Sequence, residues 1–285
     1  GNTAITTGGD LDVIATESAT INAETTSVVS ASESGIFGGT SIAVNGVIAT
    51  NVVQSEADAY ISGGSVDVNG GGSLTVSGSN TSTITAPIES QTDSGGYSIG
   101  ATLAFNSIGW ESQNILFNTI DAIIGTSLGT ANASDTRAYL SGVTSVTVDG
   151  AISVTGISIP EISAIINNAS TSISATLDSS TAIGIGAVVA MNKIKTNSES
   201  YINGATTLTS GGGLSITSSD QADIDSQVHA SSIGIGASVS SSMGFSVGIS
   251  SARNEIDSDV AAVRLQTVRL EGTAGLMRNT GLPEG

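Results

Sequence analysis

Apolar and polar residues alternate with a period of two along most of this chain. In the clearest run, the odd-numbered positions from Ile183 to Met191 are all apolar, and a second run from Ile233 to Val239 repeats the arrangement. Small residues fill the opposite face of both runs: Gly184, Gly186, Gly234 and Gly236. This alternation, rich in Val, Ile and Thr, predicts β-strands. A bare glycine face allows close approach, so we expect it to pack against another wall of the same protein or against a neighbouring molecule.

A short motif, in which apolar residues flank a glycine-rich turn, recurs five times along the chain. Its anchor residues are Leu11, Leu74, Ile152, Leu214 and Leu276, with spacings of 63, 78, 62 and 62. A fixed period indicates a repeat architecture. We therefore divide the chain into repeats at residues 1–63, 64–141, 142–203 and 204–265, and residues 266–285 begin a fifth repeat or form a tail.

Further landmarks follow the same period. Tyr60, Tyr139 and Tyr201 fall in register, and each is preceded by a run that ends in an asparagine: Asn45, Asn106 and Asn192. The apolar parity changes after each asparagine, as at a bulge or corner with one extra residue. Asparagine tolerates the left-handed backbone of such corners. These three asparagines are therefore predicted to be corner residues.

These patterns predict an all-β fold, a parallel β-solenoid (β-helix) of about four 62-residue repeats. Val, Ile and Leu would stack inside, with Ser, Thr, Asn and Gly outside, because near-identical repeats bury their faces by stacking. With perhaps three coils in each repeat and strands roughly 4.8 Å apart, the rod would be about 60 Å long. An antiparallel meander is the alternative, in which "VNGV" at 44–47 would form a hairpin turn.

The second repeat carries an insertion at 107–129, "SIGWESQNILFNTIDAIIGTSLG", which contains Trp110, the only tryptophan. Its apolar residues fall close to helical spacing, so we expect one short amphipathic helix. The helix either covers part of the solenoid's own core or offers a docking point to another chain. Trp110 is accordingly predicted to be a packing or assembly residue.

Composition narrows the function. Seven basic residues stand against 25 acidic ones, for a net charge of −18, which argues against binding to nucleic acid or to anionic membranes. No run of apolar residues is long enough for a transmembrane helix. The only histidine, His229, and the lack of cysteine give no zinc site, and we predict that the protein is not an enzyme.

Calcium is the one cofactor that the sequence leaves open. Two acidic stretches offer the hard oxygen ligands that calcium takes: Asp220, Asp223 and Asp225 in one, and Asp257 and Asp259 in the other. The calcium-roll nonapeptide GGxGxDxUx does not occur. A solvated acidic face is the simpler interpretation of these aspartates.

The stretch "AIGIGAVVAMNKIKTNSESYINGATTLTSGGGLSITS", 182–218, resembles the long repeats of very large bacterial surface and secreted proteins, adhesin-like and broadly similar to filamentous haemagglutinin. The resemblance implies an extracellular or cell-surface protein whose β-solenoid is a structural shaft or filament segment. The alternative is an adhesive module that contacts a host surface, a glycan or a sister chain.

We also expect the protein to assemble with itself, head to tail or laterally. Solenoids need polar caps, because an open end exposes unpaired backbone groups and the core. Neither end of the sequence resembles a cap, and Arg253, Arg264, Arg269 and Arg278 gather near one end of an otherwise acidic chain.

Overall fold

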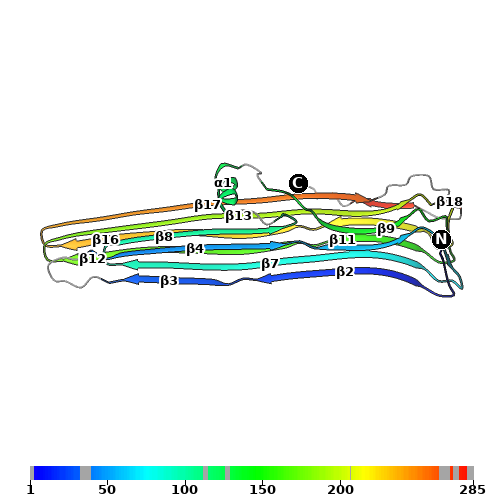
Figure 1. Ribbon diagram of the computed structural model, residues 1–285, viewed down its shortest axis with the longest axis horizontal. Coiled ribbons are helices and arrows are strands. Elements are labelled where there is room, and N and C mark those ends of the chain that lie inside the picture. Colours follow the sequence, from blue (N-terminus) through cyan, green and yellow to red (C-terminus); the bar gives the residue numbers. More distant parts are fainter. Residues whose placement is uncertain are drawn as a thin grey trace.

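The computed structural model describes residues 3–32, 40–111, 115–125, 129–205, 207–262, 270–271 and 276–280. In these ranges the protein is all-β, with three parallel sheets and one short α-helix (Figure 1). Two of the sheets contain very long strands that run along the long axis of the molecule, and the third lies at one end of them. We call them sheets A, B and C.

Each sheet collects equivalent segments from successive repeats. Sheet A contains the short strands β1 (Ala4–Thr7), β6 (Ser65–Val68), β10 (Ser145–Val148), β14 (Thr207–Ser210) and β18 (Leu270–Glu271). Sheet B contains β2 (Leu11–Asn22), β3 (Thr25–Ala31), β7 (Leu74–Ser94), β11 (Ile152–Ser158), β12 (Glu161–Thr176), β15 (Leu214–Asp220), β16 (Asp223–Ser238) and β19 (Leu276–Thr280). Sheet C contains β4 (Ile42–Val53), β5 (Glu56–Ser62), β8 (Tyr97–Ile108), β9 (Ser134–Ser141), β13 (Ser179–Asn203) and β17 (Ser241–Ala262).

The chain makes one circuit through sheets A, B and C in each repeat. It runs outward along sheet B and returns along sheet C before it enters sheet A again (Figure 1). The five anchor residues consequently form a single ladder, in which Leu11 pairs with Leu74, Leu74 with Ile152, Ile152 with Leu214 and Leu214 with Leu276. The ladders between the described strands are parallel, and residues 44–47 lie inside β4, so the antiparallel meander is wrong.

One circuit per repeat also overturns the expected dimensions. We predicted about three coils in each repeat and a rod about 60 Å long, but each repeat adds only one strand spacing, roughly 4.8 Å, to the stack. The long axis of the molecule is the strand direction instead, as in the 25 residues of β13. The protein is therefore wide across the stacking direction and thin along it.

A glycine with positive φ turns the chain from sheet C to sheet A in three successive circuits. Gly63, Gly142 and Gly204 have φ angles of 69°, 62° and 72°, and they directly follow β5, β9 and β13. This left-handed region is accessible to glycine without steric cost. The glycine-rich turn of the recurring motif lies at the next corner, where the chain passes from sheet A to sheet B.

Two apolar cores lie between the long sheets. The core nearest sheet A contains the anchors Leu74, Ile152 and Leu214, and Leu11 packs against it. Its other members include Val76, Leu140, Val154, Ile202 and Ile216. The second core lies farther along the strands and contains Ile84, Ile88, Ile108, Ile162, Ile166, Val188 and Ile194. Side chains of this kind contribute about 1.5–3 kcal/mol each when they are fully buried.

Beyond the second core the inside and outside of the protein are reversed. We call this part the tip region; in sheet C it spans residues 42–50, 97–105, 182–191 and 244–253. Ser98, Thr102 and Ala182 are buried between the sheets, whereas Ile99 points outward and is 38% exposed. The expectation that Val, Ile and Leu stack inside is therefore wrong for most of this region, where only Val47 and Val188 of these residue types face inward.

The glycines explain the reversal, because sheets B and C approach each other closely there. A Cβ atom added to Gly184 would lie 2.5 Å from the carbonyl oxygen of Ile233, and one added to Gly236 would lie 2.5 Å from that of Met243. Gly186 and Gly234 also face the backbone of the opposite sheet. No larger side chain fits between two backbones at this distance, so only the outward face of these strands can carry large residues.

Helix α1 (Ile115–Ile124) lies on the outer face of sheet C, between β8 and β9 in the chain (Figure 1). The insertion thus contains the expected short helix, but Ser107 and Ile108 still belong to β8. Residues 112–114 and 126–128 of the insertion lie outside the described residues.

Candidate functional site

Three tyrosines form a stacked ladder on the outer face of sheet C. Tyr60, Tyr139 and Tyr201 occupy one register position in β5, β9 and β13. Their ring centroids are 5.0 and 4.8 Å apart, and the rings are within 8° of parallel. The spacing is that of neighbouring strands, so the stack follows directly from the in-register repeats. Tyr60 is 51% exposed, which leaves the ladder open to solvent.

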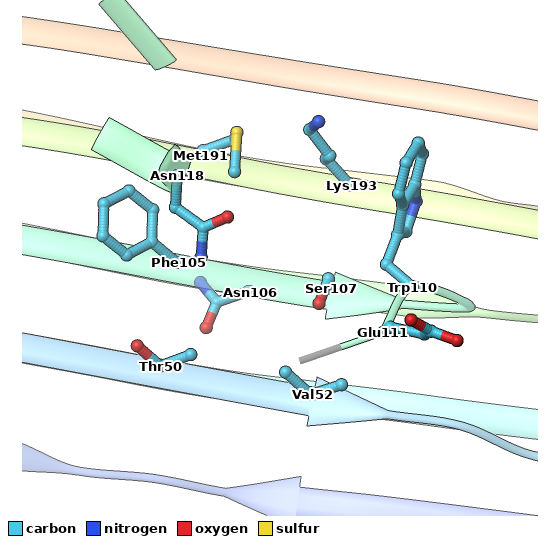
Figure 2. A pocket seen from close by; sticks show the side chains of 10 residues that line it. All are labelled: Thr50, Val52, Phe105, Asn106, Ser107, Trp110, Glu111, Asn118, Met191 and Lys193. Carbon is cyan, nitrogen blue, oxygen red and sulfur yellow. The ribbon is translucent and has the colours of Figure 1, made fainter. Parts of the chain in front are cut away.

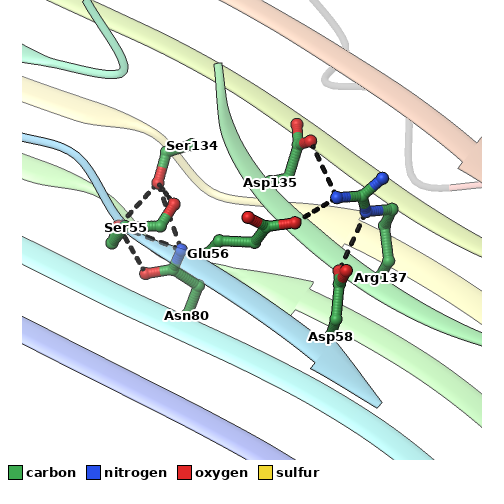
Figure 3. A network of polar contacts seen from close by, with 7 residues as sticks. All are labelled: Ser55, Glu56, Asp58, Asn80, Ser134, Asp135 and Arg137. Carbon is green, nitrogen blue, oxygen red and sulfur yellow. Dashed lines mark hydrogen bonds and ion pairs between the residues drawn. The ribbon is translucent and has the colours of Figure 1, made fainter. Parts of the chain in front are cut away.

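An ion cluster lies beside the tyrosine ladder (Figure 3). Arg137 on β9 pairs with Glu56, with Asp58 at 2.8 Å and with Asp135 at 3.2 Å. Burial raises the pKa of Asp58, and the nearby Arg137 opposes that shift. One guanidinium thus serves three carboxylates, and the cluster keeps an excess of negative charge.

The tyrosine ladder predicts an alkaline limit to stability. Burial and then the charge of Asp58 raise the pKa of Tyr139, and burial and then Tyr139 raise the pKa of Tyr201, above the ordinary value of 10.0. A raised folded-state pKa means that the folded state holds its protons longer than the unfolded state. The resulting stability is complete below the ordinary pKa and is lost as the pH rises through the shifted one.

We therefore expect the free energy of unfolding to fall as the pH rises above about 10. Tyr139→Phe should make this fall shallower, because the central phenol can then no longer ionise. Urea unfolding of both proteins at pH 7 and at several alkaline pH values measures the effect. Equal alkaline slopes for the variant and the parent protein would contradict it.

A polar layer separates the two apolar cores (Figure 3). Asn80 donates to Ser134 at 3.1 Å, and the hydroxyl of Ser55 lies 2.7 Å from those of both Ser82 and Ser134. Asn80, Ser82 and Ser134 are each no more than 2% exposed. Hydrogen bonds among these groups offset the cost of removing them from water.

A ladder of asparagines follows the inner face of sheet C; Asn51, Asn106 and Asn192 are buried, and Asn254 at the end of the ladder is exposed. The side-chain amide of Asn51 donates to Asn106 at 2.8 Å, Asn106 donates to Asn192 at 2.8 Å, and Asn192 donates to Asn254 at 2.9 Å. Asn192 also donates to the hydroxyl of Ser226 on the opposite sheet at 3.0 Å. The carboxamides of Asn106 and Asn192 both donate and accept, so the ladder fixes the register of four circuits.

The predicted corner role of the asparagines is wrong. Asn106 and Asn192 lie inside β8 and β13, and the strands continue without a bulge. The parity changes because the large apolar residues move from one face of the strand to the other. They lie on the outer face in the tip region and on the inner face beside the apolar cores. Asn45 also lies inside a strand, but its neighbour in the next circuit is Gly100, and its side chain accepts a hydrogen bond from Ser27 on sheet B. The residue that pairs with Asn106 is Asn51, which is therefore the first member of the ladder.

Helix α1 is fixed to sheet C by a buried ion pair over a small cavity (Figure 2). Lys193 Nζ lies 3.4 Å from Asp121 Oδ2. It also lies 4.6 Å from the ring centroid of Trp110, and Figure 2 shows both side chains beside the cavity. The side chains of Lys193 and Asp121 are 3% and 0% exposed. The cavity has a volume of only about 20 Å³, enough for a single water molecule. Trp110 is 6% exposed and packs within this chain.

The remaining predicted site residues are scattered. Asp223, Asp225 and His229 are exposed on the outer face of sheet B, whereas Asp257 and Asp259 are exposed on sheet C. Asp220 ends β15 and accepts a hydrogen bond from Ser258 at 3.3 Å. Within the described ranges, no three histidine, cysteine or acidic residues lie close enough together to hold a metal ion.

Sequence reasoning missed the partnership of Lys193 with Asp121 and the place of Asn51 in the ladder. The ion pair between Lys193 and Asp121 has no signal in the sequence, because it depends on how the insertion folds back onto sheet C. Asn51 does carry one: it precedes Tyr60 by the same nine residues that separate Asn192 from Tyr201.

Comparison of the chain with protein-family models, with curated proteins and with solved structures finds no match. Among the described helical residues, no segment is both long and apolar enough to cross a membrane.

Proposed function

We propose that this chain is a structural segment of a β-solenoid, a shaft or filament piece of a large bacterial surface or secreted protein. One observation carries the proposal: like residues lie on like residues through successive circuits. The anchor ladder, the tyrosine ladder and the asparagine ladder each join three or more repeats in parallel register. Such a stack grows in one dimension by adding repeats.

The extracellular location comes from the resemblance of residues 182–218 to adhesin-like repeats and from the acidic composition. A shaft built in this way is broad, because 62 residues add only one strand spacing of roughly 4.8 Å. Because the strands are long, each circuit pairs with its neighbours over many residues. The number of hydrogen bonds between adjacent circuits increases with strand length. This architecture therefore favours stiffness along the stacking direction over the length that each residue adds to the shaft.

The proposal is tested by inserting a second copy of residues 142–203 directly after Asn203. A shaft repeat should be accepted as an additional circuit, so the variant should remain folded with a thermal midpoint no lower than that of the parent. The control inserts residues 142–172 alone, half a circuit, which would disturb the register and lower the midpoint. Unfolding of the full-repeat variant would contradict the proposal.

An adhesive or binding module is the second candidate, favoured by the exposed apolar residues on the outer face of sheet C. A pure shaft needs no such surface along its side. The two functions are compatible in one protein if the broad wall of the shaft presents a contact surface.

A further inference from the structure

The outer face of the tip region of sheet C is apolar across its four strands. We call this surface the apolar wall, and it consists of four ladders: Ile42–Tyr97–Ile183–Phe245, Val44–Ile99–Ile185–Val247, Gly46–Ala101–Ala187–Ile249 and Ile48–Leu103–Val189–Ser251. Val44 is 62% exposed, Phe245 52% and Ile249 57%. The wall contains no charged residue. Contiguous apolar surface of this kind marks an interaction site.

The opposite wall of the molecule has a different character. On the outer face of sheet B, the exposed positions include Glu89, Glu161, Asp223 and Asp225. Ile173, Ile233 and Ile235 are also exposed, farther along the strands. The outer face of sheet B is therefore mixed along its length, whereas the apolar wall on sheet C carries no charge.

Helix α1 already covers the continuation of the apolar wall toward sheet A. Phe105 and Met191 occupy the next outward ladder, and both are buried against Ala122 of the helix. Leu103 and Val189, at the edge of the wall, pack against the same cluster. This outer face therefore accepts a protein layer on its apolar side chains, and the helix stops short of the rest of the wall.

We propose that the apolar wall packs face to face against the same wall of a second copy of this chain, related by a two-fold axis. Each molecule carries a net charge of −18, and this arrangement brings together the uncharged sides while the acidic outer faces of sheet B point away from each other. An isologous contact needs one self-complementary surface only. The inference concerns the side of the stack and does not depend on the shaft function.

The size of the wall suits such a contact. Four strands about 4.8 Å apart and four outward positions about 6.7 Å apart give a footprint of roughly 500 Å². Two copies would bury about 1,000 Å² in total, the level that a specific interface needs. Ile123 and Ile124, exposed at the end of α1 beside the wall, would add to it.

A lipid surface fits the wall less well. Proteins that lie on membranes combine an apolar face with lysine and arginine around it, whereas this chain has seven basic residues in total and Lys193 and Arg253 beside α1 are engaged in ion pairs. The acidic body would be repelled by anionic headgroups.

The test measures the mass of the 285-residue chain by analytical ultracentrifugation over a range of concentrations. Ile99→Lys places a charge in the middle of the wall, and Ile173→Lys is the matched control on the outer face of sheet B, where Ile173 is 54% exposed. We expect a dimer that Ile99→Lys weakens at least about tenfold and that Ile173→Lys leaves unchanged. Circular dichroism and thermal midpoints verify that both variants remain folded.

A second experiment detects the dimer directly and does not require a substitution that weakens it. The chain has no cysteine, so Ile99→Cys and Ile173→Cys each introduce a single thiol. A short bismaleimide should cross-link the first into dimers and the second far less. A parent protein that remains monomeric at high micromolar concentration, or a dimer that Ile99→Lys does not weaken, overturns the proposal. Binding of the monomer to phosphatidylcholine vesicles, lost in Ile99→Lys, would assign the wall to lipid instead.

Discussion

Gly184→Val should destabilise the protein by about 4 kcal/mol or more, or prevent it from folding, since the largest effects of single substitutions come from such overpacking. Gly184 lies on the inner face of β13, where an added Cβ would be 2.5 Å from the carbonyl oxygen of Ile233 and 3.0 Å from the hydroxyl of Ser232. The nearest obstacle is backbone, which cannot rotate away as a side chain can. The two sheets would have to separate along the whole tip region.

Gly46→Val is the matched control. Gly46 also lies inside a strand of sheet C, but it faces outward, and nothing lies within 4 Å of an added Cβ. Both substitutions replace glycine by the same β-branched residue, so strand propensity favours them equally. Urea unfolding of both variants measures the difference. Similar stabilities would show that sheets B and C are farther apart in solution than in this structure.

The same glycines mark the limit of what alternation alone can predict. A period of two divides a strand into two faces, and the sequence shows that one face carries Ile183 and Ile185 while the other carries Gly184 and Gly186. It does not say which face is inside. That depends on the distance to the opposite sheet, which is set by residues about 50 positions away, such as Ile233.

The repeat, in contrast, determined the register because identical motifs pair with each other in a parallel stack. The tyrosines and the five anchors occupy equivalent positions, as their spacing indicated. What the repeat could not show is the number of strands in a circuit. A 62-residue unit accommodates three short coils or one very long one, and the strand lengths alone distinguish them.

The asparagine ladder was misread for a related reason. A change in apolar parity has two possible causes, an extra residue or an exchange of the apolar face, and the sequence does not separate them. The hydrogen bonds do: Asn106 and Asn192 are joined side chain to side chain inside continuous strands. A carboxamide that can both donate and accept is suited to that role whether or not the chain turns there.

Lys193→Met should cost about 3–5 kcal/mol, the usual effect of breaking a buried ion pair by removing one partner. Lys193 is nearly isolated from water, and its ammonium holds Asp121 of α1 against sheet C at 3.4 Å. Methionine fills the same space without the charge, so the buried carboxylate loses the ammonium that lies 3.4 Å from it. Helix α1 should then leave the sheet, or Asp121 should take up a proton.

Fluorescence of Trp110 separates this effect from general unfolding. It is the only tryptophan, its ring lies 4.6 Å from Lys193 Nζ, and exposure to water on release of α1 would shift its emission to longer wavelength. Lys195→Met is the control, because Lys195 lies on the same face of β13 but pairs with Asp257 near the surface, where ion pairs contribute about 0–1 kcal/mol. Adding Asp121→Asn to Lys193→Met should recover part of the lost stability. If Lys193→Met and Lys195→Met proved equally mild, with unchanged emission, the ion pair would not be what holds the helix on the sheet.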